Sequence, residues 1–202
     1  MIRKKSNLFF FQIGQRFMMR RMFQTMKVNL TTIQKPCMVV VNHSSFYDSL
    51  VLFELFKRGY LPSNIVAGMS ADGLKKFPLF KGIGTFPISK PIKVSEIKQM
   101  YALAKTNTIA LFPQGVEEHQ EKRPLTIQSG MDKIISKFPQ HGIVYISIYY
   151  SYTDSLKGEV ACRMDYQPAS KRTSIQEGMT YYLDCLKAQV IATEEERFVR
   201  LW

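Results

Sequence analysis

The segment 42–48 holds the two side chains of this sequence that are best suited to activating a hydroxyl group, His43 and Asp48. A neutral imidazole, with a pKa of about 6.5, can accept a hydroxyl proton, and a neighbouring carboxylate fixes its tautomer and stabilises the imidazolium that forms. If the substrate's own hydroxyl attacks a thioester, transfer is direct and no serine nucleophile is needed. The pair is therefore sufficient for that chemistry.

The spacing of His43 and Asp48 constrains the local structure. In a regular helix, side chains five residues apart point in different directions, so the two can meet only across a turn. Ser44 or Ser45 can cap a helix that starts here, which places Asp48 in its first turn and lets the carboxylate fold back towards the imidazole. Taken alone, the residues also fit a structural interpretation, because an Asp in a first turn gains about 0.3 to 1 kcal/mol from the helix dipole.

The rest of the chain predicts the elements that position this pair. Apolar runs bounded by turn residues predict strands at 38–41, 65–67, 85–88, 108–112, 143–150 and 159–164. Helical patterns lie at 46–56, 94–104, 130–137 and 175–191. This alternation predicts an α/β fold with a largely parallel sheet flanked by helices. Sites in such sheets gather where strands end, so we expect one at the junctions after Val41 and Phe112.

Three segments, in order, resemble the sequence blocks of the glycerolipid acyltransferases, the family of glycerol-phosphate and lysophosphatidate acyltransferases. The segment 42–48 contains the HxxxxD motif of the family. The segment 84–90 resembles its second block, Gly-x-x-Phe-Ile-x-Arg, with Lys90 in place of Arg. The segment 112–115 resembles the start of its third block, Phe-Pro-Glu-Gly-Thr-Arg.

Two further positions extend the resemblance over about residues 37–150. Gly130 stands where the family has a Gly that opens a helix, and 143–148 stands where it has an apolar strand, with Tyr145 at its usual Pro. The order and spacing of the segments make the resemblance more specific than any single block.

The resemblance implies an acyltransferase fold and an enzyme that moves a fatty acyl group from acyl-CoA or acyl-carrier protein to a lipid hydroxyl. His43 would be the general base and Asp48 its orienting partner. The second and third blocks would bind the acceptor, through Gly84, Lys90, Phe112, Pro113, Gln114, Gly115 and Glu117. Neither a metal ion nor an organic cofactor is implied.

The third block departs from the family pattern, with Gln114, Val116 and Glu117 in place of Glu, Thr and Arg. An Arg at the last position would suit an acceptor phosphate through a bidentate contact, whereas a carboxylate repels it. We therefore expect a hydroxyl acceptor with neutral surroundings, such as a glycosylated lipid. Lysophosphatidate is the alternative, with phosphate contacts from Lys122 and Arg123 or from the basic group at 75, 76 and 81.

No metal site is expected. The acidic group at 117–121 is interpreted as an exposed loop, because adjacent acids in a loop are usually just solvated. The cysteines, Cys37, Cys162 and Cys185, are odd in number and far apart, which is typical of structural thiols in a reducing compartment.

The net charge of +12 is concentrated near the start of the chain. Residues 1–47 carry no acidic side chain and eight basic ones, which are Arg3, Lys4, Lys5, Arg16, Arg20, Arg21, Lys27 and Lys35. This asymmetry indicates a polyanionic partner, and a catalytically degenerate basic protein that binds anionic membrane or nucleic acid is the alternative function. A nucleic-acid binder should interleave its charges with exposed aromatic residues on the folded domain. Here the charges lie in a segment rich in Met and Phe, so we expect membrane lipid and no nucleic acid.

We expect residues 1–30 to be a basic, amphipathic, membrane-associating segment and 31–202 to be the acyltransferase domain. Helical spacing over 7–28 aligns an apolar stripe that we expect to enter lipid, formed by Leu8, Phe11, Met18, Met19, Met22 and Met26. A second strip, Phe10, Ile13 and Phe17, would then face the domain. Neither a signal peptide nor an apolar run of about 18 residues is evident, which predicts peripheral attachment to the cytoplasmic face of a membrane. No oligomeric state follows from the sequence.

Overall fold

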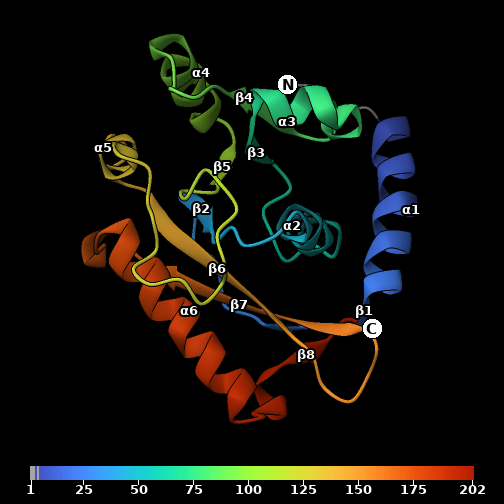
Figure 1. Cartoon of the computed structure of the whole chain (residues 1–202). Helices are drawn as coiled ribbons and strands as arrows, with labels where there is room; N and C mark the ends of the chain where they lie inside the picture. Colours follow the sequence, from blue (N-terminus) through green and yellow to red (C-terminus); the bar gives the residue numbers. More distant parts are fainter. Residues whose placement is uncertain (1–2, 4) are drawn as a thin grey trace.

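The computed structural model describes residues 3 and 5–202, which build one eight-stranded sheet with helices on both faces (Figure 1). The strand order is β4-β3-β5-β2-β6-β7-β1-β8. The strands are β1 (Phe23–Asn29), β2 (Cys37–Val41), β3 (Ile65–Ser70), β4 (Thr85–Ile88), β5 (Thr108–Leu111), β6 (Gly142–Ser151), β7 (Gly158–Gln167) and β8 (Val199–Arg200). Only β7 with β6 and β8 with β1 pair in antiparallel fashion within this sheet. The predicted α/β fold with a largely parallel sheet is confirmed.

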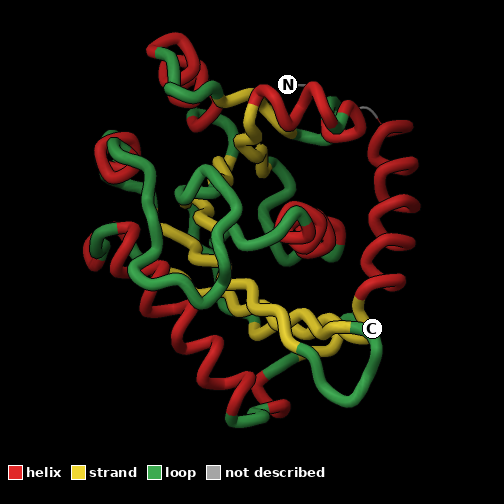
Figure 2. The backbone as a smooth tube through the Cα atoms, viewed as in Figure 1, coloured by secondary structure: helices red, strands yellow, loops and turns green. Residues whose placement is uncertain are grey.

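The helices form two layers, one on each face of the sheet (Figure 2). One layer holds α1 (Lys5–Met22), α2 (Tyr47–Lys57) and α3 (Ala71–Lys76), and the other holds α4 (Val94–Ala104), α5 (Met131–Ser136) and α6 (Ile175–Ile191). Short 3-10 turns lie at Pro78–Phe80, Ala169–Lys171 and Glu195–Arg197. Each layer has its own cluster of buried apolar side chains, so the sheet is covered on both sides.

The centre of the sheet brings the two expected junctions together. Every residue of β2 is buried, as is typical of a strand covered on both faces. β2 pairs in parallel with β5, with Val40 opposite Leu111. Because both strands run in the same direction, the loops that follow Val41 and Leu111 leave the sheet side by side.

The expected helix over 7–28 is too long. α1 ends at Met22, and Phe23 begins β1, which lies inside the sheet between β7 and β8. The basic side chain of Lys27, which fits the polar face of a helix, is instead buried and paired with Glu159 and Glu195. Of the expected 1–30 segment, therefore, α1 lies outside the sheet and 23–29 is part of it.

The expectation for the two apolar strips of α1 is wrong for the second strip and only partly right for the first. Phe11 and Met19 of the first strip are buried, whereas its Met18 and Met22 are exposed. Phe11 faces the domain because its ring packs edge-on against aromatic rings of α2 and of the 3-10 turn at Pro78–Phe80. The second strip is exposed, with Phe10, Ile13 and Phe17 at 65%, 54% and 67%, and we call these three residues the exposed strip of α1.

Gln15, the polar residue that interrupts the first strip, explains how part of that strip can be buried. Its side-chain amide donates to the carbonyl of Leu50 at 3.3 Å and to the carboxylate of Glu54 at 3.1 Å. α2 thus supplies acceptors for the Nε2 donors of Gln15, whereas the buried Oε1 of that side chain has no partner among the described residues.

Candidate active site

His43 and Asp48 meet at the junction after β2. The Nδ1 atom of His43 lies 3.0 Å from Oδ2 of Asp48, whose side chain is fully buried. The same carboxylate oxygen accepts hydrogen bonds from the backbone N–H groups of Ser44 at 2.7 Å and Ser45 at 2.8 Å. The hydroxyl of Ser45 accepts from the backbone N–H of Tyr47, the first residue of α2. The predicted turn, with Asp48 in the first turn of α2, is confirmed, but the predicted cap is wrong: the N-cap residue is Phe46, and it makes no side-chain cap hydrogen bond.

The contacts of Asp48 define the tautomer of the imidazole. A carboxylate that accepts from two backbone N–H groups leaves Nδ1 of His43 as the proton donor to it. Nε2 then carries the lone pair. No described residue bonds to Nε2, and His43 lines a cavity beside the ring of Phe112, 4.8 Å away between ring centres. The arrangement leaves Nε2 able to accept a proton from a group in this cavity.

Tyr150 is a third member of the group that the sequence did not reveal. Its hydroxyl donates to Oδ1 of Asp48 at 2.6 Å. Burial and the neighbouring charge of Asp48 raise the pKa of Tyr150 well above its usual value, so the phenol keeps the proton that it donates. Tyr150 lies on β6, far from the dyad in sequence, and only the closing of the sheet brings it there.

Two side chains hold the loop that carries His43. Asn42 is buried and exchanges hydrogen bonds with Ile148 of β6, in the manner of a further strand residue. The backbone N–H of His43 donates to Oε1 of Gln114 at 2.6 Å, and its carbonyl accepts from the backbone N–H of Glu118 at 2.9 Å. His43 is thus fixed from both neighbouring strands, β6 and β5.

Gln114 was expected to contact the acceptor, and the structure places it elsewhere. Its side chain is buried, with Oε1 bound to His43 and Nε2 donating to Glu118 at 3.2 Å. Pro113 is also buried and does not line the cavity. Because both ends of the Gln114 amide are occupied, this residue positions the catalytic loop and does not face a ligand.

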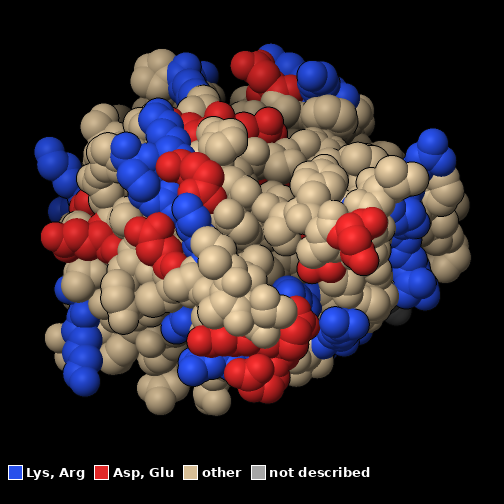
Figure 3. Space-filling view, turned by 60° about the horizontal axis from the view of Figure 1, so that its bottom comes forward, with Lys and Arg blue, Asp and Glu red and all other residues tan. Residues whose placement is uncertain are grey.

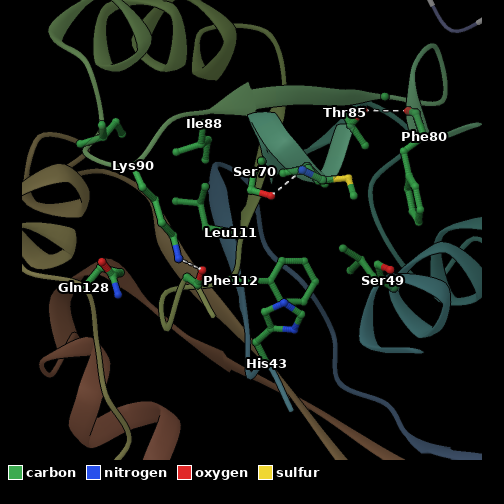
Figure 4. A pocket seen from close by; sticks show the side chains of 18 of the residues that line it. His43, Ser49, Ser70, Phe80, Thr85, Ile88, Lys90, Leu111, Phe112 and Gln128 are labelled. Carbon is green, nitrogen blue, oxygen red and sulfur yellow. Dashed lines mark hydrogen bonds between the residues drawn. The ribbon is translucent and has the colours of Figure 1, made fainter. Parts of the chain in front are cut away.

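The cavity has a volume of about 520 Å³ and two chemically different parts on either side of His43 (Figure 4). One part is apolar and lies between α2, β3 and the turn before β4. Its walls include Phe46, Phe53, Phe56, Phe77, Phe80 and Ile83. The other part, which we call the polar arm, has the polar walls Ser89, Lys90, Glu117, Gln128 and Ser129 beside apolar ones that include Ile88 and Leu111. A long apolar chain fits the first part, and a polar head group fits the second.

Five of the expected acceptor residues line this cavity, namely Gly84, Lys90, Phe112, Gly115 and Glu117. The side chain of Lys90 donates to the carbonyl of Gly115, which joins the second block to the third. Gly84 belongs to the apolar part: its φ is +109°, and a Cβ atom there would lie 2.7 Å from Nε of Arg3. Gly84 therefore serves the close approach of Arg3, which donates to the carbonyl of Ile83 at 3.2 Å.

The other charged side chains near the third block are already engaged. Lys122 binds Glu118, and Arg123 binds Asp184 on α6. Burial opposes ionisation of Glu118, but hydrogen bonds from Lys122, Thr126 and Gln114 prevail and lower its pKa to about 2. In the described part of the chain, no three His, Cys, Asp or Glu side chains gather into a metal-binding group.

Fold and site together define the class of protein: an α/β enzyme whose His–Asp pair faces a cavity with an apolar arm, suited to acyl transfer. A family model described as Acyltransferase matches residues 8–151, and the chain belongs to this family. The crystal structure of the 1-acyl-sn-glycerophosphate (LPA) acyltransferase PlsC from Thermotoga maritima is similar in fold. The TM-score is 0.60 at 14% identity, over 93% of this chain and 79% of that one. No curated protein matches significantly. The predicted family and enzyme class are confirmed.

Proposed function

We propose that this acyltransferase works at a membrane surface and moves a fatty acyl group from acyl-CoA or acyl-carrier protein to a lipid hydroxyl. The observation that carries the proposal is the position of His43, whose free nitrogen lies between an apolar and a polar arm of one cavity. The fatty chain occupies the apolar arm, and the acceptor enters the polar arm. This places the enzyme in lipid biosynthesis, and no metal ion or organic cofactor takes part.

His43 and Asp48 perform the transfer in this proposal. Nε2 of His43 takes the acceptor's hydroxyl proton as the oxygen attacks the thioester carbonyl, and Asp48 stabilises the imidazolium that forms. Collapse of the tetrahedral intermediate breaks the carbon–sulfur bond. The imidazolium returns its proton to the departing thiolate, so the products are an ester and a free thiol.

The polar arm favours an acceptor without a phosphomonoester. Glu117 is exposed at this arm, and Lys122 and Arg123, the cations that could replace the family's Arg, are bound to other carboxylates. A carboxylate about 4 Å from a phosphate dianion costs on the order of several kcal/mol at an effective dielectric constant near 20. Lys90 is the single cation beside it among the described residues of this arm. A glycosylated lipid is therefore our proposed acceptor, and lysophosphatidate, the substrate named for PlsC, is the alternative.

Membrane association is proposed through the exposed face of α1. Phe10, Ile13 and Phe17 form an apolar strip there, flanked by Arg16 and Arg20. This composition is typical of helices that lie in the interface of a bilayer. None of the helices that the structure describes is both long and apolar enough to cross a membrane. We propose attachment at the cytoplasmic face, where the free cysteines stay reduced.

The direct test is an assay of the purified protein with a long-chain acyl-CoA and a panel of acceptors that includes a monoglycosylated lipid and lysophosphatidate. Thiol release and the mass of the lipid product are measured together. We expect both to appear, to depend on His43, and to favour the glycosylated acceptor. Thiol release without an acylated lipid, or no dependence on His43, would contradict the proposal.

A further inference from the structure

A second hollow, of about 220 Å³, lies between α1, the end of α2 and Trp202. Its walls include Gln15, Arg16, Arg20, Lys57, Arg58 and Trp202. It shares no residue with the active-site cavity, so it is a separate site on the molecule. The acyl-transfer chemistry does not use it.

The hollow has an excess of positive charge. Its acidic residue, Glu54, is bound at 2.7 Å by Arg58, which also donates to the carbonyl of Leu201. Arg16 and Lys57 have no hydrogen-bond or carboxylate partner among the described residues. Arg20 lies over the ring of Trp202, 5.7 Å from its centre. Arg16, Arg20 and Lys57 therefore line a small volume, and no carboxylate of the described residues lies within ion-pair distance of any of them.

Two polar atoms of residues that line this hollow are buried and have no partner among the described residues: Nε1 of Trp202, a donor, and Oε1 of Gln15, an acceptor. One donor and one acceptor favour no particular charge, so the evidence for a ligand is the group of cations. Cations around a small hollow match a group that has several acceptor oxygens and a negative charge, which is the chemistry of a phosphate.

The place of the hollow identifies the source of the phosphate. Arg16 and Arg20 lie on α1 beside Phe17, in the same turns as the exposed apolar strip. Basic side chains lie on the edge of the molecule where α1 lies, and others lie on the opposite edge (Figure 3). With the strip in the acyl region of a bilayer, these cations lie at the depth of the lipid phosphates.

We propose that the hollow binds the phosphate of an anionic membrane lipid, as a second lipid site that orients the enzyme on its membrane. The inference rests on the proposed membrane association through α1. Its ligand is the phosphodiester of an intact lipid, held by Arg16, Arg20 and Lys57 beside the ring of Trp202, while neighbouring acyl chains contact the apolar strip.

Trp202 is the single tryptophan of the chain, so its fluorescence reports on the hollow directly. The full chain is titrated with short-chain phosphatidylglycerol below its micelle concentration, with short-chain phosphatidylcholine, and with inorganic phosphate. We expect a saturable change with phosphatidylglycerol, and at least about tenfold weaker responses to the other two ligands. Equal responses to phosphatidylglycerol and inorganic phosphate would overturn the lipid assignment, and no saturable response would overturn the site.

A triple variant, Arg16→Gln, Arg20→Gln and Lys57→Gln, tests the cations. We expect it to lose at least about tenfold in affinity for phosphatidylglycerol, since each cation near an anionic surface contributes appreciably. The matched control, Lys133→Gln, Lys137→Gln and Lys171→Gln, makes the same charge change at exposed positions remote from the hollow. Equal losses in the two variants would mean that overall charge, and not a site, binds the lipid.

Acyl transfer measured with detergent-dispersed substrates separates this inference from the proposed function. The hollow variant should keep near-normal transfer in detergent and lose transfer on vesicles that contain phosphatidylglycerol. Normal transfer on such vesicles would overturn the inference and leave the proposed function standing. If wild-type protein shows no transfer in detergent, the proposed function fails while the fluorescence result still decides the site.

Discussion

The hydroxyl of Tyr150 donates to the one oxygen of Asp48 that His43 does not contact. Oδ2 serves the imidazole and two backbone N–H groups, whereas Oδ1 serves the phenol. The buried carboxylate is thus held both by backbone N–H groups of the turn before α2 and by a side chain of β6. Its orientation towards His43 depends on a residue that the family motif does not include.

Replacing Tyr150 by Phe should slow acyl transfer without abolishing it. Oδ1 of Asp48 loses its donor, so the carboxylate is held towards His43 only by the backbone N–H groups of its own turn. We expect a loss in kcat of about tenfold or less. The free energy of unfolding should fall by about 1 to 3 kcal/mol, because a buried acceptor loses its partner.

Tyr149→Phe is the control for Tyr150→Phe. Tyr149 is the adjacent tyrosine of β6, and its hydroxyl donates to Glu121 at 2.7 Å, away from the dyad. Its kcat should match that of the wild type. Equal kcat values for the two variants, with a lower melting temperature for Tyr150→Phe, would show that Tyr150 has only a structural role.

His43→Ala should abolish most acyl transfer without unfolding the protein. A positioned general base contributes about 10² to 10⁴ in rate, and we expect a loss in that range. The side chain of His43 is 22% exposed and makes one side-chain hydrogen bond, so the thermal midpoint should change little. Turnover and melting temperature are measured on the same preparation, and near-normal turnover would exclude His43 as the base.

Glu118 should make stability depend on pH in acid. Its pKa is about 2 in the folded protein, against 4.5 for the unperturbed group, so the unfolded state binds a proton first. The stabilisation is complete above about pH 4.5 and is lost as the pH falls towards 2. We expect Glu118→Gln to be less stable than wild type at pH 7, with a gap that closes over this window. Urea unfolding at several pH values measures the difference in free energy of unfolding between the two proteins. A difference that stays constant with pH would disprove the lowered pKa of Glu118.

Glu117→Arg should redirect the acceptor preference. The variant reverses the charge at the polar arm, and we expect the ratio of kcat/KM for lysophosphatidate to that for a glycosylated lipid to rise at least about tenfold. A single change is cleaner than restoring the whole block, because Gln114 is committed to His43 and Glu118. Asp154→Arg, an equal charge reversal at an exposed position, should leave the ratio unchanged. A fall in the ratio for Glu117→Arg would refute this account of the third block.

The exposed strip of α1 should control binding to vesicles. Replacing Phe10, Ile13 and Phe17 by Ser removes apolar area worth about 1.5 to 3 kcal/mol per fully buried side chain. We expect co-sedimentation to weaken by at least about tenfold, with little change in melting temperature since all three are exposed. Deleting 1–28 is a poor test because it removes β1 from the sheet. Ile191→Ser, at a position 68% exposed on α6, is the control, and equal partitioning of all variants would exclude the strip.

The sequence predicted those parts of the molecule that depend on local patterns. The ranges of β4, α4 and α6 agree residue for residue, and the HxxxxD turn lies where expected. The predictions failed where contacts between residues that are distant in sequence determine the secondary structure. Residues 23–29 have neither Pro nor a clear alternation, and only pairing with β7 and β8 makes them a strand.

The site shows the same division. His43 and Asp48 are close in sequence, so their meeting follows from one turn, whereas Tyr150 reaches Asp48 only through the sheet. Gln114 follows a strand end like a ligand-binding residue, yet its partners are backbone and carboxylate groups of neighbouring loops. Likewise, Gln15 faces the domain because acceptors on α2 bind its side-chain amide. The helical pattern of α1 alone gives no information about these acceptors.

The absence of a linker between α1 and β1 has a mechanical consequence. Met22 ends the helix and Phe23, which pairs with Gly158 of β7, begins the strand, so no loop separates the two elements. With α1 docked as proposed, the tilt of the whole sheet on the bilayer, and the height of His43 above it, are set when the chain folds. An acceptor must then rise out of its leaflet to a fixed height, and loosely packed bilayers should release it more readily than tightly packed ones.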